Sequence, residues 1–191
     1  PAVDSLLLSY RGQLSVAAVN AADVTVVSGA LSAMSAFIAD CQAQGLDTRP
    51  LVVSHGFHSP LMDAVLADFA AVAATVQYHE PRLTFVSALT GQPERKALTR
   101  PDYWVAHLRE AVLFLPVLQY LQQQQVQVLL EVGTTDTLTG LARRFFQSAG
   151  KPANGAAVAL LASQKRDQPA LQTYLLALGQ LQLRQPMPGV A

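Results

Sequence analysis

Two histidines separated by only two residues form the clearest candidate site of this sequence. His55 and His58 lie in the segment 53–63, which has the sequence VSHGFHSPLMD. An imidazole titrates near neutral pH, so a histidine can take up a proton and return it within one catalytic cycle. Such a base normally activates a serine or cysteine beside it. The sequence contains no Gly-x-Ser-x-Gly turn and no other convincing nucleophile. It therefore contains one half of a catalytic site.

The residues by themselves leave other uses of these histidines open. An H-x-x-H pair can bind a metal ion, but no Cys, Asp or Glu is suitably placed as a third ligand, so we expect no metal site. Taken alone, His55 and His58 are more often ordinary turn residues than catalytic ones. Arg109 and Glu110 are expected to serve as a structural ion pair or as charges at a helix end.

Length and composition restrict the class of protein. A chain of 191 residues can form one domain, or a domain with a subdomain, and its 51% hydrophobic content is sufficient for a core. A net charge of +0 argues against nucleic-acid or anionic-membrane partners, which require basic excess. The single Cys41 excludes an intrachain disulfide. No apolar run reaches the roughly 18 residues of a membrane span. We expect a soluble, cytoplasmic α/β protein.

The elements before the histidine turn are predicted in the order α-β-β-α-β. A ferredoxin-like unit has the order β-α-β-β-α-β, so its first strand is missing here. That strand would lie inside the sheet, and its loss would expose backbone groups of its neighbours. We therefore expect this chain to be part of a longer polypeptide. The predicted elements are helix 1–10, a hairpin of strands 14–20 and 24–28, a helix from Leu31 that stops at Gly45, and strand 48–53.

After the histidine turn, Ser59 suits the N-cap and Pro60 the first position of an amphipathic helix over residues 61–76. Strands and helices alternate from Leu83 onward, which predicts a parallel sheet with helices on both faces. Ligands bind at the carboxyl ends of such strands, so we expect the pocket at the loops after Val53, Ala88 and Val132. The predicted strands are 83–88, 126–132 and 156–162, and the predicted helices are 101–109, 112–124, 136–147 and 167–183.

Four motifs in this order resemble the acyltransferase domain of modular polyketide synthases and the related malonyl-CoA:acyl carrier protein transacylase. The resemblance implies an α/β fold with a parallel-sheet, hydrolase-like large subdomain, incomplete here, and an inserted ferredoxin-like α+β small subdomain that lacks its first strand. It divides the chain into small subdomain 1–53, large subdomain 54–162 and post-acyltransferase linker 163–191. The motifs are VAAVNAADVTVVSG at 16–29, VSHGFHSPLMD at 53–63, YWVAHLREAVLF at 103–114 and LEVGTTDTLTGL at 130–141.

The chemistry that this resemblance implies is a two-step acyl transfer. A serine attacks an acyl-coenzyme A thioester, and the acyl group passes to the phosphopantetheine thiol of an acyl carrier protein. The second histidine of the family motif HAFH matches His58, which would be the general base and acid. The backbone carbonyl of His107 would orient its imidazole. Since the family's serine and carboxylate-binding arginine precede the residue that matches Pro1, we expect this chain alone to be inactive. No bound cofactor is implied, and an adjacent ketosynthase in the same polypeptide is expected as a partner.

The same turn predicts which extender unit is selected. In the family, HAFH accompanies malonyl and YASH accompanies methylmalonyl, whereas this chain has HGFH. Phe57 would fill the space of a 2-methyl group, which is worth about 1–3 kcal/mol. Gly56 would loosen the backbone beside His58. His55 would either line the pocket or support the turn. Substrate contacts are therefore predicted for His55, Gly56 and Phe57.

Two further readings and one departure from the family remain. A non-catalytic remnant could serve as a docking platform or spacer, and an acyl hydrolase on the same fold could release stalled chains to water. A remnant has no reason to keep His58 in the correct turn, which favours the transferase.

Where the family has Pro-His-Pro, this chain has Thr134-Thr135-Asp136, and we expect Asp136 to cap the following helix.

Overall fold

The computed structural model describes residues 2–149 and 157–184, which fold as two compact units. The first unit is Pro1–Val117 and the second is Leu118–Ala191. Helix α5 (Phe114–Gln123) spans the boundary between them. The predicted linker 163–191 begins inside the second unit, and its residues 185–191 lie outside the described residues.

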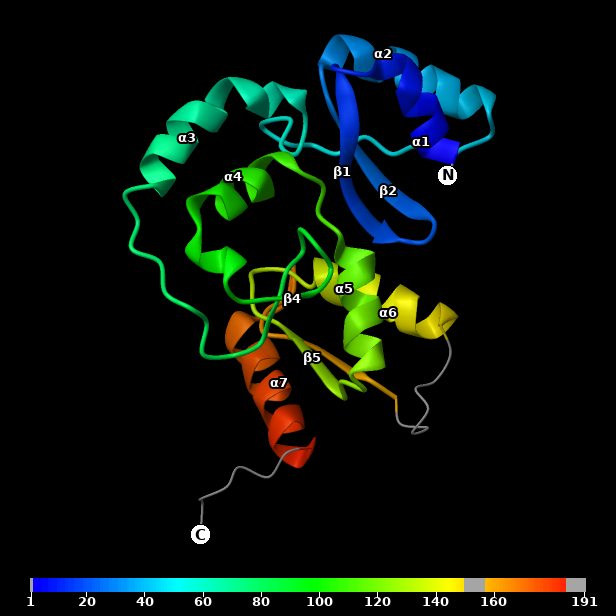
Figure 1. The fold of residues 1–191 in the computed structure, drawn as a ribbon. Helices are drawn as coiled ribbons and strands as arrows, with labels where there is room; N and C mark the ends of the chain where they lie inside the picture. Colours follow the sequence, from blue (N-terminus) through cyan, green and yellow to red (C-terminus); the bar gives the residue numbers. More distant parts are fainter. Residues whose placement is uncertain (1, 150–156, 185–191) are drawn as a thin grey trace. The chain divides into compact units, whose positions relative to one another are not determined.

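The first unit contains an antiparallel hairpin, as predicted. Strand β1 (Leu14–Ala21) pairs with β2 (Val24–Gly29), and helices α1 (Ala2–Leu7) and α2 (Leu31–Ala43) pack together beside it. Figure 1 shows both helices next to the hairpin. A 3-10 turn, η1, extends α1 from Leu8 to Tyr10. The small apolar core of this region is Leu14, Ala33, Phe37 and Cys41.

The predicted strand over residues 48–53 is wrong. The chain forms neither strand nor helix there, and the side chain of Val52 is fully exposed, at 105%. A strand is stabilised by hydrogen bonds to a neighbouring strand. None of the described strands pairs with this segment. Its apolar, β-branched composition therefore has no sheet to join.

The helix predicted after the histidine turn begins where expected but is shorter. A 3-10 helix, η2 (Pro60–Val65), passes into α3 (Leu66–Ala73), which ends three residues before Val76. The Ser59 hydroxyl accepts a hydrogen bond from the backbone N–H of Leu61 at 3.3 Å, which confirms the cap. The apolar side of this helix is exposed at Leu61, Val65, Phe69 and Val72.

The rest of the first unit departs from the predicted parallel sheet. Strand β3 is only Phe85–Val86, and it pairs antiparallel with β4 (Pro93–Glu94). A 3-10 helix, η3 (Ala97–Thr99), leads into α4 (Pro101–Arg109), which has the predicted bounds and packs against α3. The short hairpin follows from the turn residues of 90–92, which reverse the chain before a longer strand can form.

The second unit confirms the predicted strand–helix alternation. Strand β5 (Val128–Glu131) pairs in parallel with β6 (Ala159–Ala162), and helix α6 (Thr137–Ser148) lies between them in sequence. Helix α7 (Ala170–Arg184) contacts β6. Over the described ranges, no helix is long and apolar enough to cross a membrane.

Candidate active site

The backbone of His58 has a conformation that is rare for a side chain of its size. Its φ angle is 56°, in the left-handed region that glycine and asparagine normally occupy. This conformation costs on the order of 1–2 kcal/mol, so other contacts must hold it. The next residue, Ser59, is completely buried, and its hydroxyl donates to the carbonyl oxygen of Gly56 at 2.5 Å. This hydrogen bond joins residues on either side of His58 and so holds the turn.

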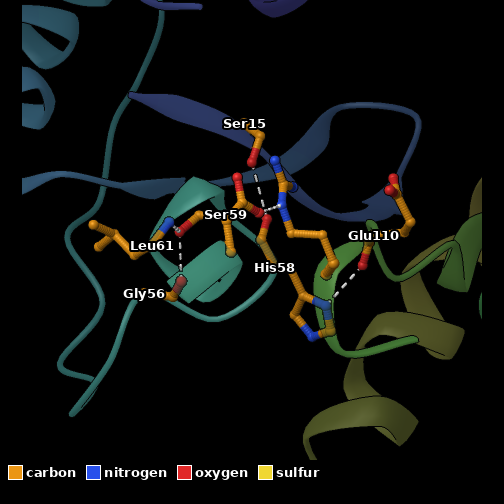
Figure 2. Close-up of polar contacts among 8 residues, drawn as sticks. Ser15, Gly56, His58, Ser59, Leu61 and Glu110 are labelled. Atoms are coloured by element: carbon orange, nitrogen blue, oxygen red, sulfur yellow. Dashed lines mark hydrogen bonds and ion pairs between the residues drawn. The ribbon is translucent and has the colours of Figure 1, made fainter. Parts of the chain in front are cut away.

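The imidazole of His58 is held by a backbone carbonyl from a different element. Its Nδ1 lies 2.7 Å from the carbonyl oxygen of Glu110, and Figure 2 shows the ring directed at this oxygen. A carbonyl can only accept a hydrogen bond, so Nδ1 carries the proton and donates it. In the neutral imidazole Nε2 is then unprotonated, with its lone pair free to take a proton. This tautomer is the one that a general base on Nε2 needs.

The structure corrects the predicted source of the orienting carbonyl. It belongs to Glu110, three residues after His107. His107 lies inside α4, where carbonyls point along the helix axis. Glu110 follows the last helical residue and has an extended backbone, with φ −82° and ψ 162°, so its carbonyl points away from the helix.

Strand β1 connects both ends of this hydrogen bond. The hydroxyl of Ser15 donates to the backbone carbonyl of His58 at 3.0 Å. Two residues after Glu110, Val112 forms an isolated parallel bridge with β1, donating to Ala17 and accepting from Val19, both at 2.9 Å. The histidine turn, the end of α4 and β1 thus form a closed circuit of hydrogen bonds, of which Figure 2 shows the bonds from Ser15 and His58 to the carbonyls of His58 and Glu110. This circuit determines where the imidazole points.

The side chain of His107 lies near the same place, although its carbonyl does not hold His58. Burial lowers the pKa of the His107 imidazole, and the charge of His58 lowers it further. The His107 ring lies against Tyr103 and Trp104, with ring centroids 6.1 and 6.3 Å away. Tyr103 is buried and shares a 2.5 Å hydrogen bond with the hydroxyl of Ser87. His107 therefore lies in a mainly aromatic setting that disfavours its charged form.

The remaining predicted site residues lie on the exposed side of the turn. The side chain of Phe57 is 48% exposed, and its ring lies 5.7 Å from the ring of His55. His55 is exposed, with its Nδ1 3.0 Å from the hydroxyl of the adjacent Ser54. These two rings form a small aromatic surface beside His58.

Gly56 is not a loose point in the turn. A Cβ atom on Gly56 would lie 2.9 Å from Cδ1 of Leu61 and 3.3 Å from the hydroxyls of Ser28 and Ser59. Glycine therefore provides space for the leucine side chain, and its carbonyl is held by Ser59. The first of these contacts means that an alanine at position 56 requires Leu61 to move.

Three loops are predicted to line the pocket, and two of them, those after Val53 and Ala88, are connected through residues 110–113. His58 contacts Glu110, and the carbonyl of Ala88 accepts a hydrogen bond from the N–H of Leu113 at 2.6 Å. The loop after Val132 belongs to the second unit. In the described parts of both units, no group of three His, Cys, Asp or Glu side chains could hold a metal ion.

The loop after Val132 is held differently from the prediction. Asp136 is the N-cap residue of α6, but its side chain makes no capping hydrogen bond. Glu131, at the end of β5, caps the helix instead, accepting from the N–H groups of Leu138 at 3.2 Å and Thr139 at 2.7 Å. The backbone of Asp136, with φ −118° and ψ 31°, is not the extended one of a usual cap. The Ser163 hydroxyl bonds both backbone groups of Gly133.

Sequence reasoning missed two residues of the site, Ser15 and the carbonyl of Glu110. Ser15 is one of two polar residues, with Asn20, in a mainly apolar strand, where it could equally face solvent. A backbone carbonyl has no side-chain signature at all. The only available signal was the end of the helix at Arg109, after which carbonyls become free to accept from other elements.

Comparison with known proteins places the chain in a family. The acyl transferase domain family matches residues 5–188. The chain is 40% identical over 178 residues to the polyketide synthase GfsB of Streptomyces halstedii, covering 92% of this chain and 3% of that protein. It is 36% identical over 182 residues to the phenolphthiocerol synthesis polyketide synthase type I Pks15/1 of Mycobacterium marinum, covering 94% and 8% respectively. The chain thus spans only a small part of these curated relatives.

Solved structures agree with this placement. The acyltransferase domain from the second module of the salinomycin polyketide synthase superposes with a TM-score of 0.84 at 33% identity, covering 94% of this chain and 40% of that one. A malonyl-transacylase in complex with a type II polyketide synthase acyl-carrier protein gives a TM-score of 0.72 at 25% identity, covering 91% and 54%. The fold is the α/β fold of these domains, and the chain belongs to the acyl transferase domain family.

Proposed function

We propose that this chain supplies the histidine half of a polyketide synthase acyltransferase site, with His58 as the general base and acid. The observation that carries the proposal is the hydrogen bond from Nδ1 of His58 to the carbonyl of Glu110, because it leaves the Nε2 lone pair free. The nucleophilic serine, the oxyanion hole and the carboxylate-binding arginine are proposed to lie in the part of the domain that this chain does not span.

In the first step, Nε2 of His58 removes the proton from the serine hydroxyl as the oxygen attacks the thioester carbonyl of the acyl-coenzyme A. The carbon–sulfur bond then breaks, and the imidazolium protonates the departing thiolate. The products are an acyl-serine and free coenzyme A. Throughout, the Glu110 carbonyl holds Nδ1–H and stabilises the imidazolium, as a carboxylate does in the serine protease triad.

In the second step, Nε2 takes the proton of the phosphopantetheine thiol on an acyl carrier protein. The sulfur attacks the acyl-serine ester, and the imidazolium returns its proton to the serine oxygen. The chain requires no bound cofactor in this scheme. The proposed partners are the acyl-coenzyme A, the acyl carrier protein and an adjacent ketosynthase in the same polypeptide. The carrier-protein proposal is supported by the similarity to a transacylase solved in complex with one.

The proposed extender unit is malonyl, and Phe57 is the proposed specificity residue. Its half-exposed ring and the ring of His55 form the aromatic surface beside His58. A 2-methyl group would compete with the phenyl ring for that space. We further propose that residues 1–53 are the ferredoxin-like small subdomain, 54–162 the large subdomain and 163–191 the following linker.

The test is loading of the parent polypeptide with labelled malonyl-coenzyme A, with and without His58→Asn. Asparagine suits the left-handed backbone at this position, so the variant removes the imidazole without adding strain. Loss of the base is expected to lower loading by about 10²- to 10⁴-fold. His79→Asn is the matched control, since His79 lies outside the circuit around His58.

Unchanged loading in His58→Asn would refute the assignment. A parent that loads no acyl group, together with absence of a Gly-His-Ser-x-Gly turn in it, would favour the docking platform. Release of labelled malonate to water faster than transfer to the carrier protein would favour the hydrolase.

A further inference from the structure

The ion pair between Asp63 and Arg109 has no role in the scheme above, yet it joins the two segments that the scheme depends on. Nε of Arg109 lies 2.5 Å from Oδ1 of Asp63. Asp63 belongs to η2, five residues after His58. Arg109 is the last residue of α4 and directly precedes Glu110.

This ion pair and the hydrogen bond between His58 and Glu110 are two separate contacts between the same two segments. Both connect the histidine turn directly to the end of α4, whereas Ser15 and Val112 connect each of them separately to β1. Without the ion pair, the distance from Nδ1 to the Glu110 carbonyl would depend on β1, on the packing of α4 against α3 and on the extended residue at the helix end. With it, the two segments are held at two points.

The exposure of the pair argues against a role in stability alone. The Asp63 side chain is 57% exposed and the Arg109 side chain 24% exposed. Exposed ion pairs contribute little to the stability of a fold, because water already solvates both charges. A short contact of this kind can still restrict the relative position of two segments, since the planar guanidinium gives it a direction.

We propose that Asp63 and Arg109 are positioning residues that hold the Glu110 carbonyl against Nδ1 of His58 and so maintain the tautomer with a free Nε2. This inference rests on the proposed function of His58 for its catalytic meaning, but its structural content can be tested without turnover.

The test is nitrogen NMR of the imidazoles in the 191-residue chain labelled with ¹⁵N-histidine. The chain has four histidines, so the His58 signals are assigned from their absence in His58→Asn. Nδ1 and Nε2 shifts report which nitrogen carries the proton. The unaltered chain is expected to show the Nδ1–H form almost exclusively. Asp63→Ala and Arg109→Met are expected to give a mixture of both tautomers.

Arg95 and Glu80 provide a matched control. They form an ion pair with both side chains exposed, at 71% and 45%, also through an arginine Nε, at 2.6 Å. Glu80→Ala removes a comparable ion pair and is expected to leave the His58 tautomer unchanged. Arg109→Lys keeps a cation opposite Asp63 but loses the planar guanidinium, so it is expected to fall between the unaltered chain and Arg109→Met. A purely structural role would lower the unfolding temperature in Asp63→Ala without changing the tautomer.

The proposal is overturned if Asp63→Ala keeps the Nδ1–H form, if Glu80→Ala changes the tautomer as strongly, or if Arg109→Lys behaves like Arg109→Met. In the parent polypeptide, Asp63→Ala is expected to lower kcat by about tenfold with KM unchanged, as for other residues that orient a reacting histidine. Failure of the proposed function is distinguishable, because His58→Asn would then load normally whatever the NMR result.

Discussion

The turn that holds His58 and the turn between β5 and α6 both follow segments predicted as strands, but they are held for different purposes. At the first, hydrogen bonds from β1 and from the end of α4 act on the carbonyl and ring of one histidine. At the second, Glu131 satisfies the N–H groups that begin α6, and Ser163 bonds Gly133. The second set closes a helix end and joins two neighbouring strands.

The difference shows how to separate a site from a scaffold. A rare backbone angle at His58 costs free energy, and the hydrogen bonds to its own carbonyl and ring do not complete any helix or strand. At the turn after β5, both side-chain hydrogen bonds of Glu131 satisfy N–H groups that a helix must satisfy anyway. Substitutions in the first turn should therefore change chemistry more than stability, and those in the second should do the reverse.

The largest effect in this comparison is expected from Phe57→Ser. Removing the phenyl ring opens space beside His58 and should raise loading of methylmalonyl relative to malonyl by about 10- to 200-fold. The measurement is competition between the two labelled coenzyme A thioesters in the parent polypeptide. An unchanged ratio would contradict the steric role of Phe57. A large loss of thermal stability would mean that the histidine turn serves the fold, as the turn between β5 and α6 does.

For the second turn we expect the opposite result. Glu131→Ala removes the acceptor of two helix N–H groups and should lower the free energy of unfolding by about 1–2 kcal/mol. Asp136→Ala is the matched control, because Asp136 makes no capping bond and its loss should have little effect. Urea unfolding of the chain measures both. Equal losses in the two variants would refute the assignment of the cap to Glu131.

Ser15→Ala tests whether β1 holds the histidine turn. Loss of the donor to the His58 carbonyl should cost about 1 kcal/mol and shift the backbone amide signals of the histidine turn. Ser148→Ala serves as the control, since that hydroxyl bonds the carbonyl of Phe145 in its own helix end. If Ser15→Ala, like the control, leaves the amide signals of the histidine turn unshifted, then β1 does not hold this turn.

The smallest effect concerns pH. Burial lowers the pKa of His107 from its ordinary value of 6.5, so below pH 6.5 the unfolded chain binds this proton more readily than the folded one. Stability present above that pH is therefore lost as the pH falls through the folded pKa. His107→Gln, which cannot bind a proton there, should remove part of the loss. Urea unfolding at about pH 7.5 and about pH 5.5 measures this. An identical loss in the variant would contradict it.

Local signals predicted much of the fold. Ser59 and Pro60 mark a helix start, Pro101 begins α4, and the hairpin of β1 and β2 follows from β-branched runs around turn residues. Residues 48–53 have the same kind of signal but form no strand, because a strand depends on a partner as well as on its own composition. The same limit applies to 83–88, where only Phe85–Val86 finds a partner, in β4.

The sequence by itself determined the family and the position of the candidate histidine, because both depend on side chains in a specific order along the chain. Only the tertiary structure decided which carbonyl holds His58 and which acid caps α6. Every residue has a carbonyl, so nothing in the sequence distinguishes that of Glu110 from that of His107. The choice depends on where α4 ends and on how β1 brings that end beside the histidine turn.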